Sequence, residues 1–301
     1  MQRIIFFFFV LCSLPAFAQK TDQKLQKEIE ALVKDFHGDI GVYVHDLKRD
    51  KIVAINADTI FPTASIVKMS ILLGIMQKIE SGSLSYHQRL TYTDSLFYNE
   101  GDDILSAFKD SATIELSKVM MLMLTISDNC ASLWLQGLAG GGKRINEILD
   151  SIGFKATRVN SRTPGREVNR SMYGWGQTSP KEIATFMERI VNNQILSKES
   201  SEKMLRLLGR QYWDKEALSQ IPPGTFVADK NGAVDESRNE VVYVNSKNNP
   251  YIFSIFTKNN KDITWESNNE AWVLTRKLSA LLWKYYNPKS NWQATSADIA
   301  K

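Results

Sequence analysis

Cysteine and histidine are scarce in this chain, which has two cysteines and three histidines in 301 residues. Cys12 lies in an N-terminal segment that we expect to be removed, so Cys130 alone would remain and no intramolecular disulfide could form. His37, His45 and His87 all lie in the first third of the chain. No His-Glu-x-x-His motif or Cys/His cluster is present, which argues against a metal enzyme. We expect no metal and no cofactor.

The chain also lacks a large excess of positive or negative charge. The formal net charge of +4 is too small to indicate a nucleic-acid binder. The first eighteen residues, MQRIIFFFFVLCSLPAFA, are typical of a secretory signal peptide that is cut before Gln19. Cys12 does not follow the small residues that a lipoprotein signal requires, so we expect no lipid anchor. The mature chain has no further apolar run of membrane-spanning length, which predicts a soluble protein in the periplasm or secreted from the cell.

Repeats and low-complexity linkers are absent, which favours one domain over residues 19–286 and a polar tail over 287–301. Periodicity predicts strands near both ends and mostly helices in between. The expected elements are helices over 20–36 and 265–286 and strands over 40–47, 51–57, 225–234, 240–246 and 251–257. We therefore expect an antiparallel sheet built from both termini and flanked by helices (about 19–60 and 222–286), with a helical subdomain (about 61–221).

The stretch FPTASIVKMSILLGIMQKI, residues 61–79, predicts a helix that is buried on every side. Lys68 follows Ser65 by three residues, so the two side chains share a helix face. Lys68 could reach water at the helix end, or it could be held beside Ser65 to take its proton. The other two Ser-x-x-Lys matches, Ser106/Lys109 and Ser200/Lys203, lie in polar surroundings typical of solvated helix faces.

Two short polar motifs interrupt apolar sequence further along. Ser127-Asp128-Asn129 is compatible with a capped turn between helices, but also with a turn that points into a cleft. Lys230-Asn231-Gly232 is compatible with an edge-strand lysine beside a glycine bulge.

Taken in order, Ser-x-x-Lys, Ser-Asp-Asn and Lys-x-Gly resemble the class A β-lactamases and related penicillin-recognising serine enzymes. The resemblance covers nearly the whole mature chain. Two further stretches fit it: QTSPKEIATFM (177–187) is similar to the family's Thr-Thr-Pro helix start, and ESRNEVVYV (236–244) to the strand with its substrate-binding arginine. The resemblance implies the α/β plus all-α fold of serine β-lactamases, a monomer, and a β-lactam or peptidoglycan-like peptide as substrate.

The resemblance also implies a role for each motif residue. Ser65 would be the acylated nucleophile and Lys68 its activator, while Ser127 would pass a proton to the leaving nitrogen and Lys230 would assist that transfer. Asn129 would bind the amide side chain of the substrate. The oxyanion hole would consist of the main-chain N–H groups of Ser65 and Ala233, next to Gly232.

Two departures from the family pattern bear on catalysis. Asn231 stands where the family has a Thr or Ser that binds the substrate carboxylate, and Arg238 would compensate. The family's deacylating Glu lies four residues before an Asn. If Asn169 is that Asn, the Glu position holds Gly165, and Glu167 is two residues out of register. We therefore expect slow deacylation, with Glu167 either a solvated loop carboxylate or a base brought in by a rearranged loop.

Three other functions compete with this interpretation. A Ser-His-Asp hydrolase is disfavoured because the histidines come early and no Gly-x-Ser-x-Gly elbow is present. A binding or sensor protein that is acylated at Ser65 without turnover would fit the missing Glu. A peptidase acting on D-alanyl peptides would use the same residues.

Overall fold

The computed structural model describes residues 19–98, 103–247 and 249–295. The expected signal peptide, 1–18, and the last six residues of the expected tail lie outside these ranges. None of the helices within them is long and apolar enough to cross a membrane.

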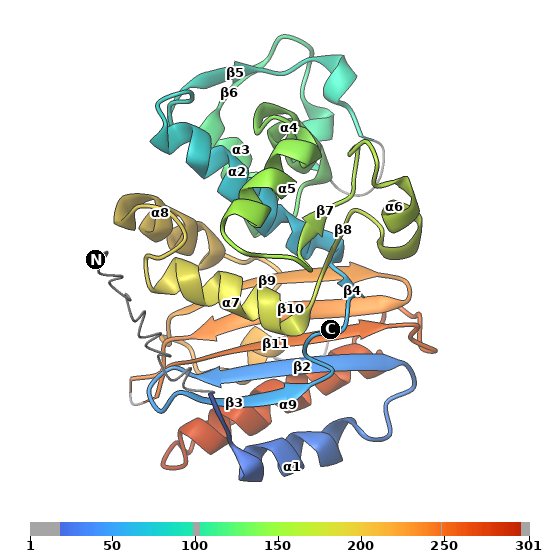
Figure 1. The fold of residues 1–301 in the computed structure, drawn as a ribbon, viewed down its shortest axis with the longest axis vertical. Helices are drawn as coiled ribbons and strands as arrows, with labels where there is room; N and C mark the ends of the chain where they lie inside the picture. Colours follow the sequence, from blue (N-terminus) through green and yellow to red (C-terminus); the bar gives the residue numbers. More distant parts are fainter. Residues whose placement is uncertain (1–18, 99–102, 248, 296–301) are drawn as a thin grey trace, which may run out of the picture.

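A six-stranded sheet forms the centre of the fold, in the order β1-β3-β2-β11-β10-β9 (Figure 1). Its strands are β1 (Lys20–Thr21), β2 (Asp39–Asp46), β3 (Lys51–Ile55), β9 (Val227–Val234), β10 (Ser237–Val244) and β11 (Tyr251–Lys258). All pairs are antiparallel except β1 with β3. The five expected strands are confirmed, and β2 from the N-terminal half pairs directly with β11 from the C-terminal end.

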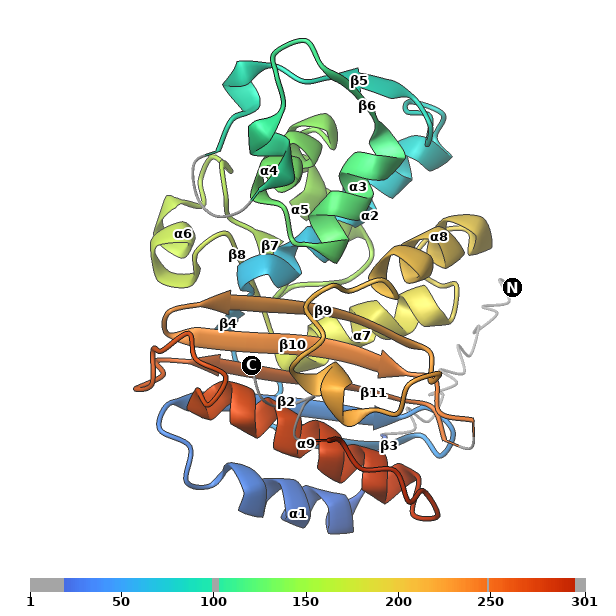
Figure 2. The ribbon, with the colours of Figure 1, turned by 180° about the vertical axis from the view of Figure 1, so that it is seen from behind.

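One face of the sheet is covered by α1 (Gln23–Val33), α9 (Glu270–Tyr286) and the short 3-10 helix η4 (Ala217–Gln220) (Figure 2). Asp22 caps α1 by accepting a hydrogen bond from the Leu25 N–H at 3.3 Å. The expected helix over 265–286 begins only at Glu270, because the Asn269 side chain accepts from the Ala271 and Trp272 N–H groups and so starts the helix there.

The other face carries α7 (Pro180–Val191) and, beyond it, the helical region. The helices of that region are η1 (Ala64–Val67), α2 (Lys68–Glu80), η2 (Asp94–Leu96), η3 (Ile104–Ala107), α3 (Leu116–Thr125), α4 (Asn129–Leu138), α5 (Gly141–Ser151), α6 (Glu167–Tyr173) and α8 (Lys198–Leu208). The region also contains two small sheets. One consists of β4 (Phe61–Pro62), β8 (Gly176–Thr178) and β7 (Arg158–Val159), and the other of β5 (Arg89–Thr91) and β6 (Thr113–Glu115). Although α7 falls within the stretch expected to form the helical subdomain, it packs on the sheet, where the Ser254 hydroxyl donates to the Pro180 carbonyl at 2.8 Å.

The helix α2 passes through the middle of the helical region, and every residue from Lys68 to Met76 is buried. This agrees with the mostly apolar sequence of 61–79, although the chain is helical only from Ala64 onward. An ammonium group at the start of such a helix must find polar partners, because an unpaired buried charge is strongly destabilising.

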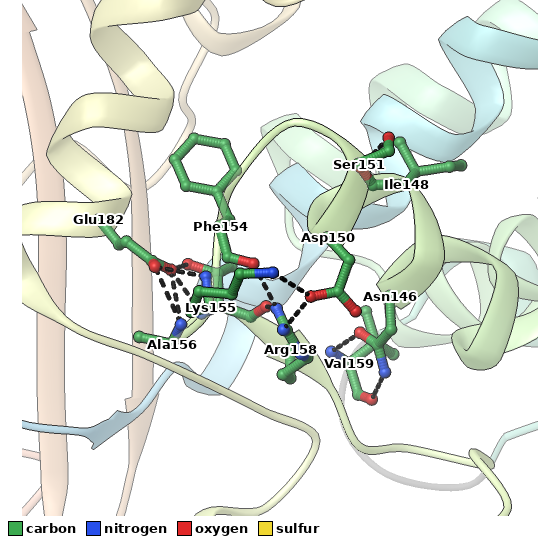
Figure 3. A network of polar contacts seen from close by, with 11 residues as sticks. Asn146, Ile148, Asp150, Ser151, Phe154, Lys155, Ala156, Arg158, Val159 and Glu182 are labelled. Atoms are coloured by element: carbon green, nitrogen blue, oxygen red, sulfur yellow. Dashed lines mark hydrogen bonds and ion pairs between the residues drawn. The ribbon is translucent and has the colours of Figure 1, made fainter. Parts of the chain in front are cut away.

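A polar network fixes the segment that leads from α5 into β7 (Figure 3). The Glu182 carboxylate of α7 accepts hydrogen bonds from the main-chain N–H groups of Lys155, Ala156 and Thr157. The Arg158 guanidinium pairs with Asp150 of α5 at 2.6 Å. The network holds the start of β7 against α5 and α7. The chain then enters the segment 160–177, which contains α6 and leads into β8.

Candidate active site

Ser65 lies in the 3-10 helix η1, which leads directly into α2. Ala64, immediately before it, has a φ of 45°, an unfavourable value for a residue with a Cβ. The Lys68 ammonium donates a hydrogen bond to the Ser65 Oγ at 3.1 Å. Lys68 is completely buried, so it does not reach water at the helix end.

The same ammonium joins the first two motifs. It donates to the Ser127 Oγ at 3.0 Å, to the Asn129 Oδ1 at 2.9 Å and to the Ser127 carbonyl oxygen. Ser127 has a φ of 66°, so this turn holds its hydroxyl in a conformation that non-glycine residues seldom adopt. Strain of this kind persists where surrounding contacts fix the chain, and it is common in functional sites.

Two carboxylates fix that turn. Asp128 caps α4 by accepting from the Ala131 N–H at 2.7 Å, and it also accepts from the Leu105 N–H at 3.0 Å. Asp103 accepts from the Asn129 N–H at 2.7 Å. The turn is thus capped, as one interpretation predicted, and of its three residues Asn129 lines the cavity beside Ser65. Sequence reasoning missed Asp103, since no motif surrounds it and its partner lies 26 residues along the chain.

The pKa of Lys68 is held well below its ordinary value. Burial is the main cause, and the positive charge of Lys230 adds to it, while Asp103 and Asp128 act in the opposite direction. A lysine with a depressed pKa can exist as a neutral amine and can then take the proton of a hydroxyl 3.1 Å away.

Gly232 allows β9 to approach the nucleophile closely. A Cβ atom placed on Gly232 would lie 2.5 Å from the Thr63 carbonyl oxygen and 2.8 Å from the Ser65 nitrogen. Only glycine fits there. The next residue is Ala233, whose N–H group was expected to share the oxyanion hole with that of Ser65, and both residues line the same cavity.

Lys230 is completely buried on the same strand. Its ammonium donates to the carbonyl oxygen and to the side-chain Oδ1 of Asn231, each at 3.0 Å. The same Oδ1 accepts from the Gln211 Nε2 at 3.4 Å. The Asn231 Oδ1 is thus engaged with Lys230 and Gln211, whereas binding of a substrate carboxylate would use the amide nitrogen of the same side chain. Burial lowers the pKa of Lys230, against the effect of the negative charges of Asp229 and Glu240.

The expectation that Arg238 binds a substrate carboxylate does not agree with its position. The side chain is buried, and its guanidinium donates to main-chain carbonyls that include those of Asp235 and Thr264. Its central carbon lies 4.3 Å from the ring centroid of Trp265 and 4.8 Å from that of Trp272. The carbonyls and the two rings surround the guanidinium, so Arg238 holds the β9–β10 turn and the segment before α9 together.

Glu167 does not enter the site either. It is exposed at the start of α6, where its Oε1 accepts from the Gly165 N–H at 3.0 Å. Hydrogen bonds from main-chain N–H groups lower its pKa, as expected for a carboxylate at a helix N-terminus. The rearranged loop that would have brought Glu167 to the ester is therefore not observed. Gly165, in the expected Glu position, has a φ of 80°.

A cavity of about 460 Å³ opens beside Ser65. Asn129 and Tyr98 line one side, Met172 and Trp175 of the 160–177 segment another, and the β9–β10 turn a third. This volume suits a small organic molecule.

The histidines serve elsewhere. His45 is buried between Glu188 at 3.0 Å and Asp50 at 3.0 Å, whereas His37 pairs with Glu270 and His87 with Glu115 at the surface. None of the three lines the described walls of the cavity. A Ser-His-Asp arrangement at Ser65 is thus not formed.

Comparisons with known proteins agree with this geometry. A family model described as "Beta-lactamase enzyme family" matches residues 24–286. The β-lactamase VEB-1 of Pseudomonas aeruginosa is 23% identical over 296 residues, covering 95% of this chain and 98% of that protein.

Solved structures share the fold. The structure of PBP-A superposes with a TM-score of 0.78 at 24% identity, covering 90% of this chain and 98% of that one. A class A β-lactamase from Mycobacterium abscessus superposes with a TM-score of 0.76 at 22% identity, covering 87% and 99%. The match over residues 24–286, together with the expected fold, shows that this chain belongs to the beta-lactamase enzyme family.

Proposed function

We propose that this enzyme hydrolyses the amide bond of β-lactams through an ester formed on Ser65. One observation carries the proposal: the buried Lys68 ammonium lies within hydrogen-bond distance of both the Ser65 Oγ, at 3.1 Å, and the Ser127 Oγ, at 3.0 Å. A single nitrogen therefore touches the nucleophile and the hydroxyl that would lead to the leaving group. Because the pKa of Lys68 is depressed, its neutral form is accessible.

Acylation uses these contacts in sequence. The Ser65 oxygen attacks the β-lactam carbonyl carbon while its proton passes to neutral Lys68, and the N–H groups of Ser65 and Ala233 stabilise the oxyanion. The amide C–N bond then breaks. The leaving nitrogen takes the Ser127 hydroxyl proton, and Ser127 regains one from Lys68. The products of this step are an ester on Ser65 and neutral Lys68.

Deacylation lacks the family's carboxylate. Water must attack the ester carbon, lose a proton to a base and release Ser65, and Gly165 offers no side chain for this task. Among the residues that the structure describes, Lys68 is the basic group hydrogen-bonded to Ser65. Loss of one general base typically costs roughly 10²–10⁴-fold in such a step. We infer that acylation is fast and deacylation slow, so that the acyl-enzyme accumulates.

Nitrocefin hydrolysis tests the proposal. A stopped-flow trace should show a burst equal to one product per enzyme, followed by slow linear turnover. A burst with no later turnover would instead indicate a sensor or penicillin-binding protein. The absence of a burst and of turnover with every β-lactam tried would contradict the proposal. We propose that the signal peptide expected over 1–18 exports the enzyme to the periplasm or out of the cell.

A further inference from the structure

The cavity beside Ser65 extends away from the leaving-group side of the site. Of the described motif residues, Ser65, Asn129 and Ala233 line it, whereas Ser127 and Lys230 do not. In the proposed reaction the leaving nitrogen lies at Ser127, so the cavity must receive the opposite part of the substrate, the acyl side chain. Two charged residues line its described walls, Lys258 and Glu236.

The Lys258 ammonium is held in place by part of its hydrogen-bonding capacity. It ends β11, and its ammonium donates to the Ile60 carbonyl at 3.0 Å and lies 5.0 Å from the centroid of the Phe61 ring. Within the described part of the chain no carboxylate lies within 4.0 Å of it. Asp39, opposite Lys258 on β2, accepts instead from the Asn259 side chain at 2.8 Å. Two of the three ammonium donors can therefore turn to a ligand.

Glu236 lies in the turn between β9 and β10 and is exposed. Its main chain is anchored, since its carbonyl accepts from the Asn260 N–H at 3.2 Å. Neither an arginine nor a lysine of the described residues forms an ion pair with its carboxylate. One cavity thus presents an ammonium and a carboxylate that are not paired with each other.

We propose that Lys258 and Glu236 select substrates whose acyl side chain ends in an amino-acid zwitterion. The substrate carboxylate binds the Lys258 ammonium and the substrate ammonium binds the Glu236 carboxylate. The inference rests on the proposed acylation of Ser65 and adds its substrate class. A neutral side chain can still enter, but it leaves both charges without a partner.

Four penicillins with one bicyclic nucleus and different acyl groups test this selection. The acyl groups are phenylacetyl (neutral), 5-carboxypentanoyl (anionic), 6-aminohexanoyl (cationic) and α-aminoadipoyl (zwitterionic). The second-order rate constant of acylation is measured for each by competition with a fluorescent penicillin. For the wild type, we expect the zwitterionic compound to react roughly tenfold faster than the neutral one.

Single variants test whether Lys258 and Glu236 each contribute to the preference for the zwitterionic compound. Lys258→Met should remove most of the advantage of the zwitterionic over the cationic compound, and Glu236→Gln most of its advantage over the anionic one. Lys261→Met, at an exposed lysine that does not line the cavity, is the matched control and should keep the wild-type ratios. Ratios unchanged within twofold in both cavity variants would overturn the selection. Failure of all four compounds to acylate the wild type would instead contradict the proposed function itself.

Discussion

Gly232 and Ser65 are in such close contact that a methyl group on the glycine would lie 2.8 Å from the serine nitrogen. That approach brings the end of β9 against η1, and Ser65 and Ala233 line one cavity. In the proposed mechanism the contact between Lys68 and Ser65 supplies the base, and this strand-to-helix contact positions the oxyanion hole.

Gly232→Ala should therefore reduce acylation. The added methyl must displace β9 from the Thr63 carbonyl and the Ser65 nitrogen, and loss of one oxyanion donor costs roughly 10²–10³-fold in rate. Stopped-flow acylation by nitrocefin measures the effect. Gly137→Ala is the control, because no atom outside its own stretch of the α4 backbone lies within 4 Å of its added Cβ. Wild-type acylation in Gly232→Ala would contradict the assignment of the hole.

Arg238→Met should lower stability rather than substrate recognition. The substitution removes a buried guanidinium from several carbonyl partners and from the rings of Trp265 and Trp272, and we expect a loss of about 2–4 kcal/mol in the free energy of unfolding. Urea unfolding measures this, with the exposed Arg210→Met as control. The ratio of acylation rates for a penicillin and its carboxylate methyl ester should stay as in the wild type. If the variant instead favoured the methyl ester more than the wild type does, Arg238 would bind the substrate carboxylate after all.

Glu167→Gln should leave deacylation nearly unchanged, within about twofold, because the carboxylate is exposed and bonded to the Gly165 N–H. The decay of the acyl-enzyme is followed after removal of excess penicillin. A collapse of turnover with a persistent acyl-enzyme would identify Glu167 as the base.

The pH dependence of acylation should report Lys68. Because the pKa of Lys68 is lowered, the neutral amine forms as pH rises through a value below the ordinary 10.5, and acylation should increase over that range. Lys68→Arg, whose guanidinium stays protonated, should lose the increase and roughly 10²–10⁴-fold in rate. If the acylation rate of Lys68→Arg rose with pH as in the wild type, another group would accept the proton.

The strands were predictable because they depend on short-range pattern, whereas the Ser-x-x-Lys, Ser-Asp-Asn and Lys-x-Gly motifs were each ambiguous alone and were recognised from their order and the resemblance that it carries. Alternating or continuous apolar runs marked β2 and β9 to β11, and the buried helix around Lys68 required a polar partner that Ser65 supplies. The positions of Arg238 and Asp103 were not predictable in this way. Their partners, Trp272 and Asn129, lie 26 or more residues away and are brought close only by the folded chain.

The most direct measurement is intact-protein mass spectrometry during incubation with benzylpenicillin, for the wild type and for Ser65→Ala. The wild type should gain the mass of one penicillin within the first time points and lose it slowly, and peptide mapping should locate the adduct on Ser65. Ser65→Ala, with an unchanged unfolding midpoint, should gain nothing. An adduct of equal extent in Ser65→Ala, or an adduct on another residue of the wild type, would contradict acyl transfer through Ser65.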